Sequence, residues 1–368
     1  MKKSVANNFL CLIIACSVVV ISSCKKDKEQ QPAPAITNYA TLGLYQKSSV
    51  DNGTTYKRVF MPVKIGTTNL RYPTIFDTGS TGLTIDANGI LPANMITSNG
   101  LIIPGDTVDV DGGITVTNQT GFIAFGGGAS GETREYGNLA YATVTLGDAN
   151  TGTVTTTRIP FFIYYKVVDQ TNNVPYPAHT ADVFGVGPGT SYVNSLIDSP
   201  LSHFKLPASV TNGFKLALFS TPFTSTLTSV PGLLTIGLTP TDLNSSGFIM
   251  HNLDFYSVGG YSPNIRAKIT YGNKTVNTAF LLFDTGDPAI TYLADPTATG
   301  VTTLPTGTAV SLTTNNGFSY QYTTATSSNV TQVVNSSGDF RSIFSIDFFV
   351  KNQYLLDYQN HRIGLKNN

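Results

Sequence analysis

The stretch Phe76-Asp77-Thr78-Gly79-Ser80 occurs a second time, almost unchanged, as Phe283-Asp284-Thr285-Gly286-Asp287. An apolar run begins at residue 72 before the first copy and at residue 278 before the second, and another apolar stretch follows each copy. Each copy therefore predicts a strand that turns sharply and presents one carboxylate at the turn. Because the copies lie in comparable halves of the chain, we predict an internal duplication that brings Asp77 and Asp284 together.

The composition favours strands over helices. Of the 368 residues, 41% are hydrophobic and only 12% are charged, a balance that can build a large core. Few segments show the i, i+3, i+4 spacing of apolar residues that an amphipathic helix requires. We therefore predict an all-β protein, in which residues 194–204 form one of the few candidate helices.

The first 23 residues have the pattern of a secretory signal peptide. A basic start at Lys2 and Lys3 precedes an apolar run, Phe9 to Ile21, that is short for a membrane span. The run ends in Ile-Ser-Ser-Cys, which resembles the bacterial lipobox, so Cys24 is predicted to be lipidated and to begin the mature chain. An ordinary signal peptide or an uncleaved anchor is the alternative.

Residues 24–38 are charged and then Pro-rich, which predicts a solvated tether. Beyond the tether we place an N-terminal lobe at residues 39–208 and a C-terminal lobe at residues 209–368. Lipid on Cys24 would attach the protein to a membrane. We therefore expect a lipoprotein of the bacterial cell envelope, at the outer membrane or cell surface, with a periplasm-facing position as the alternative. The sequence does not predict the oligomeric state.

Composition and motifs argue against several other kinds of site. The formal net charge is zero and no basic stripe is present, so nucleic acid is not an expected partner. The four histidines do not have the spacing of a Cys/His metal site, so we expect neither a metal nor a cofactor. No Lys-Ser or Lys-Thr follows the glycines at 126–128, which favours a hairpin turn over a phosphate-binding loop.

Two neighbouring carboxylates can perform acid–base chemistry together. When they lie about 3 Å apart they cannot both ionise cheaply, so the pair shares one proton and titrates as a unit. One carboxylate can then take a proton from water as the water attacks a peptide carbonyl, while the other protonates the carbonyl oxygen. The hydroxyls of Thr78 and Thr285 are placed to link the two loops. Gly79 and Gly286, having no Cβ, let a backbone N–H approach a carboxylate closely.

The flanks of both copies resemble the pepsin-like aspartic peptidases over nearly all of residues 55–365. Ile65-Gly66-Thr67 stands twelve residues before Asp77, which is the family's spacing. Residues 123–128 fall where the flap that covers the substrate belongs. Residues 182–187 resemble the segment that completes the first active-site loop. Residues 232–237 and 343–365 resemble, respectively, the strand that opens the second lobe and the family's C-terminal stretch.

This resemblance implies a bilobal fold of two β-barrel-like lobes, with Asp77 and Asp284 as the catalytic pair in the cleft between them. It implies an aspartic endopeptidase whose partner is a peptide or an unfolded protein substrate. The implied supporting residues of the two catalytic loops, followed by those of the flap, are Thr78, Gly79, Ser80, Thr285, Gly286 and Asp287, then Phe125 and Gly126.

Four positions depart from the family's pattern. Phe125 replaces the flap tyrosine, and Thr84 replaces its tryptophan partner. Asp287 stands where a Ser or Thr hydroxyl is expected to donate to the second catalytic carboxylate, which an ionised carboxylate cannot do. Its charge would also raise the proton affinity of the pair. Ser345 replaces a usual glycine. These departures keep a second function open: a catalytically impaired protein of this fold that binds a peptide, a protein or a glycan.

Overall fold

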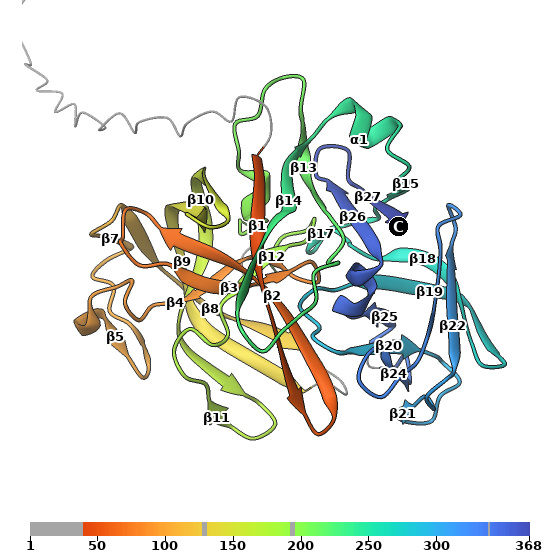
Figure 1. The fold of residues 1–368 in the computed structure, drawn as a ribbon. Coiled ribbons are helices and arrows are strands. Elements are labelled where there is room, and N and C mark those ends of the chain that lie inside the picture. The colour runs from red at the N-terminus through yellow and green to blue at the C-terminus, as the bar shows by residue number, and fades with distance from the viewer. Residues whose placement is uncertain (1–39, 127–130, 192–195, 338) are drawn as a thin grey trace, which may run out of the picture. The chain divides into compact units, whose positions relative to one another are not determined.

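The computed structural model describes residues 40–126, 131–191, 196–337 and 339–368. The predicted signal peptide, Cys24 and the tether lie outside these residues. Strands make up most of the described chain, as the composition predicts (Figure 1). No helix in the described ranges is both long and apolar enough to cross a bilayer.

The largest sheet has fifteen strands drawn from both halves of the chain. In sheet order they are β15 (Ile249–Asn252), β27 (Arg362–Asn367), β26 (Asn352–Asp357), β13 (Thr211–Leu216), β14 (Thr228–Leu238), β1 (Ala40–Asp51), β2 (Thr54–Ile65), β3 (Tyr72–Asp77), β12 (Val183–Val186), β4 (Thr81–Asp86), β10 (Gly152–Asp169), β9 (Glu132–Asp148), β8 (Ile114–Gly126) and β7 (Thr107–Val110), with β11 (Val174–Pro175) beside β10.

A second sheet of eight strands comes from the C-terminal half alone. Its order is β21 (Thr302–Thr303), β24 (Val330–Val334), β20 (Ile290–Ala294), β25 (Arg341–Phe344), β19 (Lys274–Phe283), β18 (Ile265–Tyr271), β22 (Ala309–Thr314) and β23 (Ser319–Thr323). Two small pairs complete the strands: β5 (Ile96–Thr97) with β6 (Gly100–Leu101), and β16 (Phe255–Tyr256) with β17 (Gly260–Tyr261).

Both Asp-Thr-Gly stretches occupy the same position in a repeated three-strand arrangement. β3 leads into Asp77 and β4 leaves it, but β12 lies between them, parallel to β3 and antiparallel to β4. In the second half β19 leads into Asp284 and β20 leaves it, and β25 lies between them with the same two orientations. This repeat is the structural form of the predicted internal duplication.

The largest sheet continues across the predicted lobe boundary. β14 pairs with β1, and β13 pairs with both β14 and β26. β26 and β27 form the closing hairpin that the sequence predicts at the end of the chain. Strands from the beginning, middle and end of the described chain are therefore hydrogen-bonded in one sheet, and the boundary near residue 208 stays a prediction.

In the described ranges helical structure is confined to short turns, and the helix predicted at residues 194–204 is wrong in its described part. Only a 3-10 turn, η3 (Pro200–Ser202), forms there. Ser199 is extended, with φ −63° and ψ 130°, because the ring of a proline disfavours helical backbone at the residue before it. The others are α1 (Pro240–Asn244), η1 (Ala93–Met95) and η4 (Ile346–Val350).

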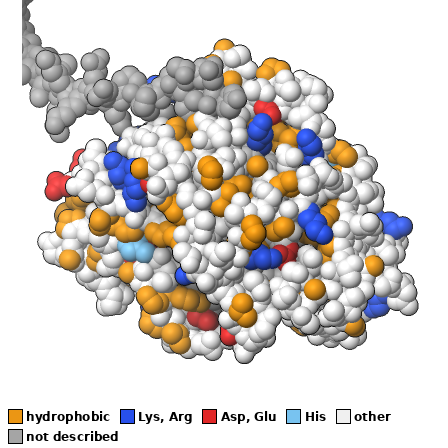
Figure 2. Space-filling view, in the orientation of Figure 1, with side chains coloured by type: hydrophobic (Ala, Val, Ile, Leu, Met, Phe, Trp, Pro, Cys, Tyr) orange, Lys and Arg blue, Asp and Glu red, His pale blue; other side chains and the backbone are white. Residues whose placement is uncertain are grey.

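Charged side chains do not gather on the face shown in Figure 2. Lys and Arg lie singly or in twos among uncharged atoms there, without a continuous basic stripe. Among the residues that the structure describes, His, Cys, Asp and Glu form no group suited to hold a metal ion.

Aromatic rings pack beneath each Asp-Thr-Gly turn. Phe76 stacks on Phe184 with ring centroids 6.0 Å apart. Phe283 packs on Phe344 at 5.5 Å and on Phe348 at 4.1 Å. The residue before each aspartate is therefore held by the strand inserted between its flanking strands, which ties the position of the carboxylate to the core.

We predict that Phe283→Ala lowers the free energy of unfolding by about 3–5 kcal/mol, because it leaves a cavity among buried rings. Phe283 is only 2% exposed. Phe255→Ala is the matched control, since Phe255 is 65% exposed and its loss should cost under about 1 kcal/mol. Urea unfolding measures both values, and equal losses would contradict this account of the core.

Candidate active site

Reciprocal hydrogen bonds link the two Asp-Thr-Gly turns. The Thr78 hydroxyl donates to the Phe283 carbonyl, and the Thr285 hydroxyl donates to the Phe76 carbonyl, each at 2.7 Å. Each hydroxyl also accepts from the backbone N–H of the other threonine at 3.0 Å. Both threonines are buried, so these four bonds are shielded from water and fix one turn against the other.

The two carboxylates converge above this linkage. Asp77 Oδ1 accepts from the Gly79 N–H at 2.7 Å, and Asp284 Oδ1 accepts from the Gly286 N–H at 2.7 Å. A Cβ on Gly79 would lie 2.4 Å from the Asp284 carboxylate, and a Cβ on Gly286 would lie 2.6 Å from that of Asp77. Each glycine is required because the opposing carboxylate occupies the space that a side chain would fill.

The two aspartates have different partners. Asp77 Oδ2 accepts a second hydrogen bond, from the Ser80 hydroxyl at 2.5 Å. Burial raises the pKa of Asp284 well above its ordinary value. The charge of Asp77, a hydrogen bond with Asp77 and the charge of Asp287 raise this pKa further, against the effect of the Gly286 N–H. We therefore assign the shared proton to Asp284.

Asp287 does not act as the counterpart of Ser80. Its Oδ1 accepts from the N–H groups of Ala289 and Ile290, each at 3.2 Å, so the side chain turns into its own loop. Burial raises the pKa of Asp287 to about 6, although these N–H groups and the Arg58 charge lower it. Asp287 is therefore a third carboxylate near the pair and provides no hydroxyl for Asp284.

Sequence reasoning missed Arg58, a partly buried cation beside this site. Its guanidinium donates to the carbonyl of Gly286. Burial lowers the pKa of Arg58, whereas the charges of Asp287, Asp284 and Asp77 raise it. Two adjacent cations on a strand are a common surface pattern, and Arg58 and Gly286 are 228 residues apart. No local signal pointed to this contact.

The predicted flap is a hairpin of β8 and β9. Their register runs without a shift from Thr120↔Asn138 to Gly126↔Glu132, and Phe125 pairs with Thr133. Gly126 has φ +75°, which the turn into the tip requires. Residues 127–130, at the tip, lie outside the described part of the chain.

The serine that replaces a usual glycine fits its position. Ser345 is fully buried, its N–H donates to the Thr291 hydroxyl at 3.3 Å, and its own hydroxyl lies 3.5 Å from the same oxygen. At the corresponding Gly185 a Cβ would lie 2.8 Å from the Ser80 hydroxyl, among other atoms. In the second half Asp287 takes the position of Ser80 and has no hydroxyl. The close contact with a hydroxyl that excludes a Cβ at Gly185 therefore does not arise for the Cβ of Ser345.

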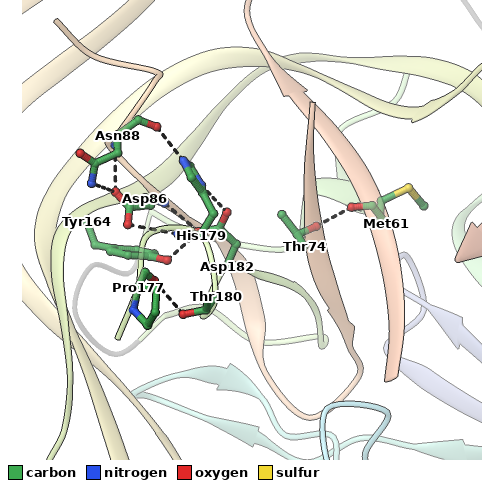
Figure 3. A network of polar contacts seen from close by, with 9 residues as sticks. All are labelled: Met61, Thr74, Asp86, Asn88, Tyr164, Pro177, His179, Thr180 and Asp182. Carbon is green, nitrogen blue, oxygen red and sulfur yellow. Dashed lines mark hydrogen bonds and ion pairs between the residues drawn. The ribbon is translucent and has the colours of Figure 1, made fainter. Parts of the chain in front are cut away.

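A polar network joins the end of β4 to β10 and to the residues that precede β12 (Figure 3). Asp182 Oδ1 accepts from the Asp86 N–H at 2.8 Å and from the Tyr164 hydroxyl at 2.6 Å. His179 Nδ1 lies 2.8 Å from Asp182 Oδ2, and its Nε2 lies 2.6 Å from the Asn88 carbonyl. Both ring nitrogens face oxygen acceptors, so the protonated imidazolium satisfies this site best.

The same network fixes the strand that carries Asp77. The Asp182 carbonyl accepts from the Ile75 N–H at 2.8 Å. Burial lowers the pKa of His179, but the hydrogen bond and charge of Asp182, the Asn88 carbonyl and the charge of Asp86 outweigh burial and raise it above 6.5. The stabilisation is therefore complete below the unfolded-state pKa of histidine and is lost as the pH rises through the folded-state pKa.

We predict that His179→Gln lowers the free energy of unfolding by about 1–2 kcal/mol more at pH 5.5 than at pH 8.5, because glutamine cannot supply the charge. The control is His251→Gln, since burial lowers the pKa of His251 and reverses the expected sign. Urea unfolding at the two pH values measures both. A cost of His179→Gln that does not depend on pH would contradict the protonated assignment.

Several solved structures share this architecture. The aspartic proteinase from Irpex lacteus matches with a TM-score of 0.54 and 15% sequence identity, over 90% of this chain and 97% of that one. Basic 7S globulin from soybean matches with a TM-score of 0.54 and 13% sequence identity, over 90% of this chain and 96% of that one. Conglutin gamma, a basic 7S globulin from lupine seeds, matches with a TM-score of 0.53 and 13% sequence identity, over 90% of this chain and 95% of that one. No protein-family model and no curated protein matches the sequence.

These similarities confirm the predicted all-β, bilobal, pepsin-like aspartic protease fold. Identities of 13–15% carry the fold and not the activity. The structures that share it are named as a proteinase and as globulins, so function has to be argued from the residues of the site.

Proposed function

We propose that this protein is an aspartic endopeptidase that hydrolyses peptide bonds with Asp77, Asp284 and a water molecule. The convergence of the two carboxylates across Gly79 and Gly286 carries the proposal. Two acidic groups held this closely share a proton, and the pair can then act as a base and an acid in the same step.

The hydrogen-bond partners assign the roles. Asp77, charged and bonded by Gly79 and Ser80, takes a proton from the water that attacks the peptide carbonyl carbon. Asp284 gives its proton to the carbonyl oxygen, which forms a tetrahedral diol. As the C–N bond breaks, Asp77 passes its proton to the leaving nitrogen and Asp284 recovers one from a diol hydroxyl. The site thus returns to its starting protonation state.

The proposal includes the substrate and the location. The substrate is a peptide or an unfolded protein, bound in an extended conformation in the cleft beneath the hairpin of β8 and β9. The predicted lipid on Cys24 would hold the enzyme at the bacterial cell envelope.

A second candidate is a protein of the same fold that binds a peptide, protein or glycan without cleaving it. The position of Asp287 favours this reading, because Asp284 has no hydroxyl donor equivalent to Ser80 there. Two of the structures that match are named as globulins and not as proteinases, which is compatible with this second candidate.

We expect the purified protein to cleave an unfolded protein between about pH 3 and pH 7, and a statine-type inhibitor to block the cleavage. Asp77→Asn and Asp284→Asn should each lower kcat by at least about 10²- to 10⁴-fold, because each removes a proton acceptor or donor. Mass spectrometry of the cleaved protein measures the rate.

Asp254→Asn is the control for a lost surface carboxylate, since Asp254 forms an exposed ion pair with Arg266, and it should leave the rate unchanged. The thermal midpoint of each variant shows whether it is folded. No cleavage at any pH in the range, or an unchanged rate for Asp77→Asn, would overturn the proposal and favour the binding protein.

A further inference from the structure

Asp287 creates an electrostatic problem at the floor of the site. With the shared proton on Asp284, an Asp77–Asp284 pair alone carries one negative charge. An ionised Asp287 adds a second, and its charge raises the proton affinity of Asp284. Unless a cation offsets this charge, the pair would need a higher pH to lose its second proton.

Arg58 is the cation that the fold places there. Its guanidinium donates to the Gly286 carbonyl, which belongs to the peptide unit joining Gly286 to Asp287. With Arg58 included, the cluster returns to a net charge of one negative. Arg58 and Asp287 therefore offset each other and restore the charge of an ordinary pair that shares one proton.

The guanidinium is held in place by the residue beside it. The Lys57 N–H donates to the Pro288 carbonyl at 2.8 Å, and the Lys57 ammonium forms an ion pair with Asp347. β2 therefore contacts the turn on both sides of Asp287, at Gly286 and at Pro288. A cation fixed by backbone contacts on both sides stays close to the carboxylates, unlike a cation on a mobile surface side chain.

The other titratable groups around the cluster are tyrosines and the Lys57–Asp347 ion pair. Tyr292 on β20 interacts with the charge of Asp287 and with Tyr56 on β2, and Tyr354 on β26 interacts with the charge of Asp284. Burial raises the pKa of Tyr292 to about 12, and it also raises the pKa of Tyr354 above its ordinary value. The Lys57–Asp347 pair is neutral as a whole.

We propose that Arg58 is a positioning residue that compensates the charge of Asp287 and thereby sets the pH range in which the Asp77–Asp284 pair is active. This inference rests on the proposed peptidase function for its catalytic consequence. Its electrostatic part is independent of catalysis.

The first test is the pH profile of kcat/KM. Arg58→Gln removes a positive charge, so both limbs should move to higher pH by about one unit. Asp287→Asn removes a negative charge that is present only above the Asp287 pKa of about 6, so the basic limb should move to lower pH and the acidic limb should stay in place. The double variant should lie near wild type on the basic limb, and Arg58→Lys should keep both limbs near wild type because it keeps the charge.

Arg71→Gln is the matched control, because Arg71 also donates to a glycine carbonyl, that of Gly147, on a different turn. It should leave the profile in place. If Arg58 had only a structural role, Arg58→Gln would lower the rate, but the basic limb of its profile would not move in the direction opposite to that of Asp287→Asn. Limbs that stay in place in Arg58→Gln would overturn the inference.

The second test does not require activity. The free energy of unfolding of Arg58→Gln, relative to wild type, should fall more at pH 7.5 than at pH 3.5, because Asp287, with a pKa of about 6, is charged only at the higher pH. The same substitution in an Asp287→Asn background should show a smaller dependence on pH. A cost equal at both pH values would overturn the inference. If the protein cleaves nothing, the peptidase proposal fails, but the unfolding measurement still tests the charge compensation by Arg58. The failure of one proposal can therefore be distinguished from the failure of the other.

Discussion

The reciprocal bonding of Thr78 and Thr285 is the constraint on which the rest of this structure depends. Each hydroxyl donates to a carbonyl of the other turn and accepts an N–H from the other threonine. Because the groups are buried, losing either hydroxyl would leave the partner's polar atoms unpaired in an apolar interior. The bonds therefore fix two turns from opposite halves of the chain, and the separation of the two carboxylates follows from that position.

The surrounding fold makes this linkage rigid from behind. In each half a strand is inserted between the two strands that flank the aspartate, and its phenylalanine packs on the phenylalanine that precedes the aspartate. In the first half the Asp182 network adds a further set of buried hydrogen bonds. The carboxylates thus stand on strands whose own positions are fixed by core packing, which is what acid–base chemistry in a preorganised site requires.

The repeated architecture does not make the two aspartates chemically equal. Asp77 has a hydroxyl donor in Ser80, whereas Asp284 has a third carboxylate, Asp287, at the corresponding position. Arg58 gives this difference a consistent electrostatic account, since a guanidinium bonded to the same turn offsets the added negative charge. In the sequence Asp287 argued against catalysis. With Arg58 beside it in space, Asp287 is compatible with an active pair.

The sequence by itself determined the features that depend on local patterns. Apolar runs ending in Asp-Thr-Gly specified two strand-turn units, and the glycines specified close approach, because backbone sterics act between neighbouring residues. The hairpins at residues 121–137 and at the end of the chain followed from the same rules. Only the tertiary structure decided the position of Arg58, the direction of the Asp287 side chain and the His179 network. These arise where residues distant along the chain meet, and no spacing in a single sequence records such a meeting.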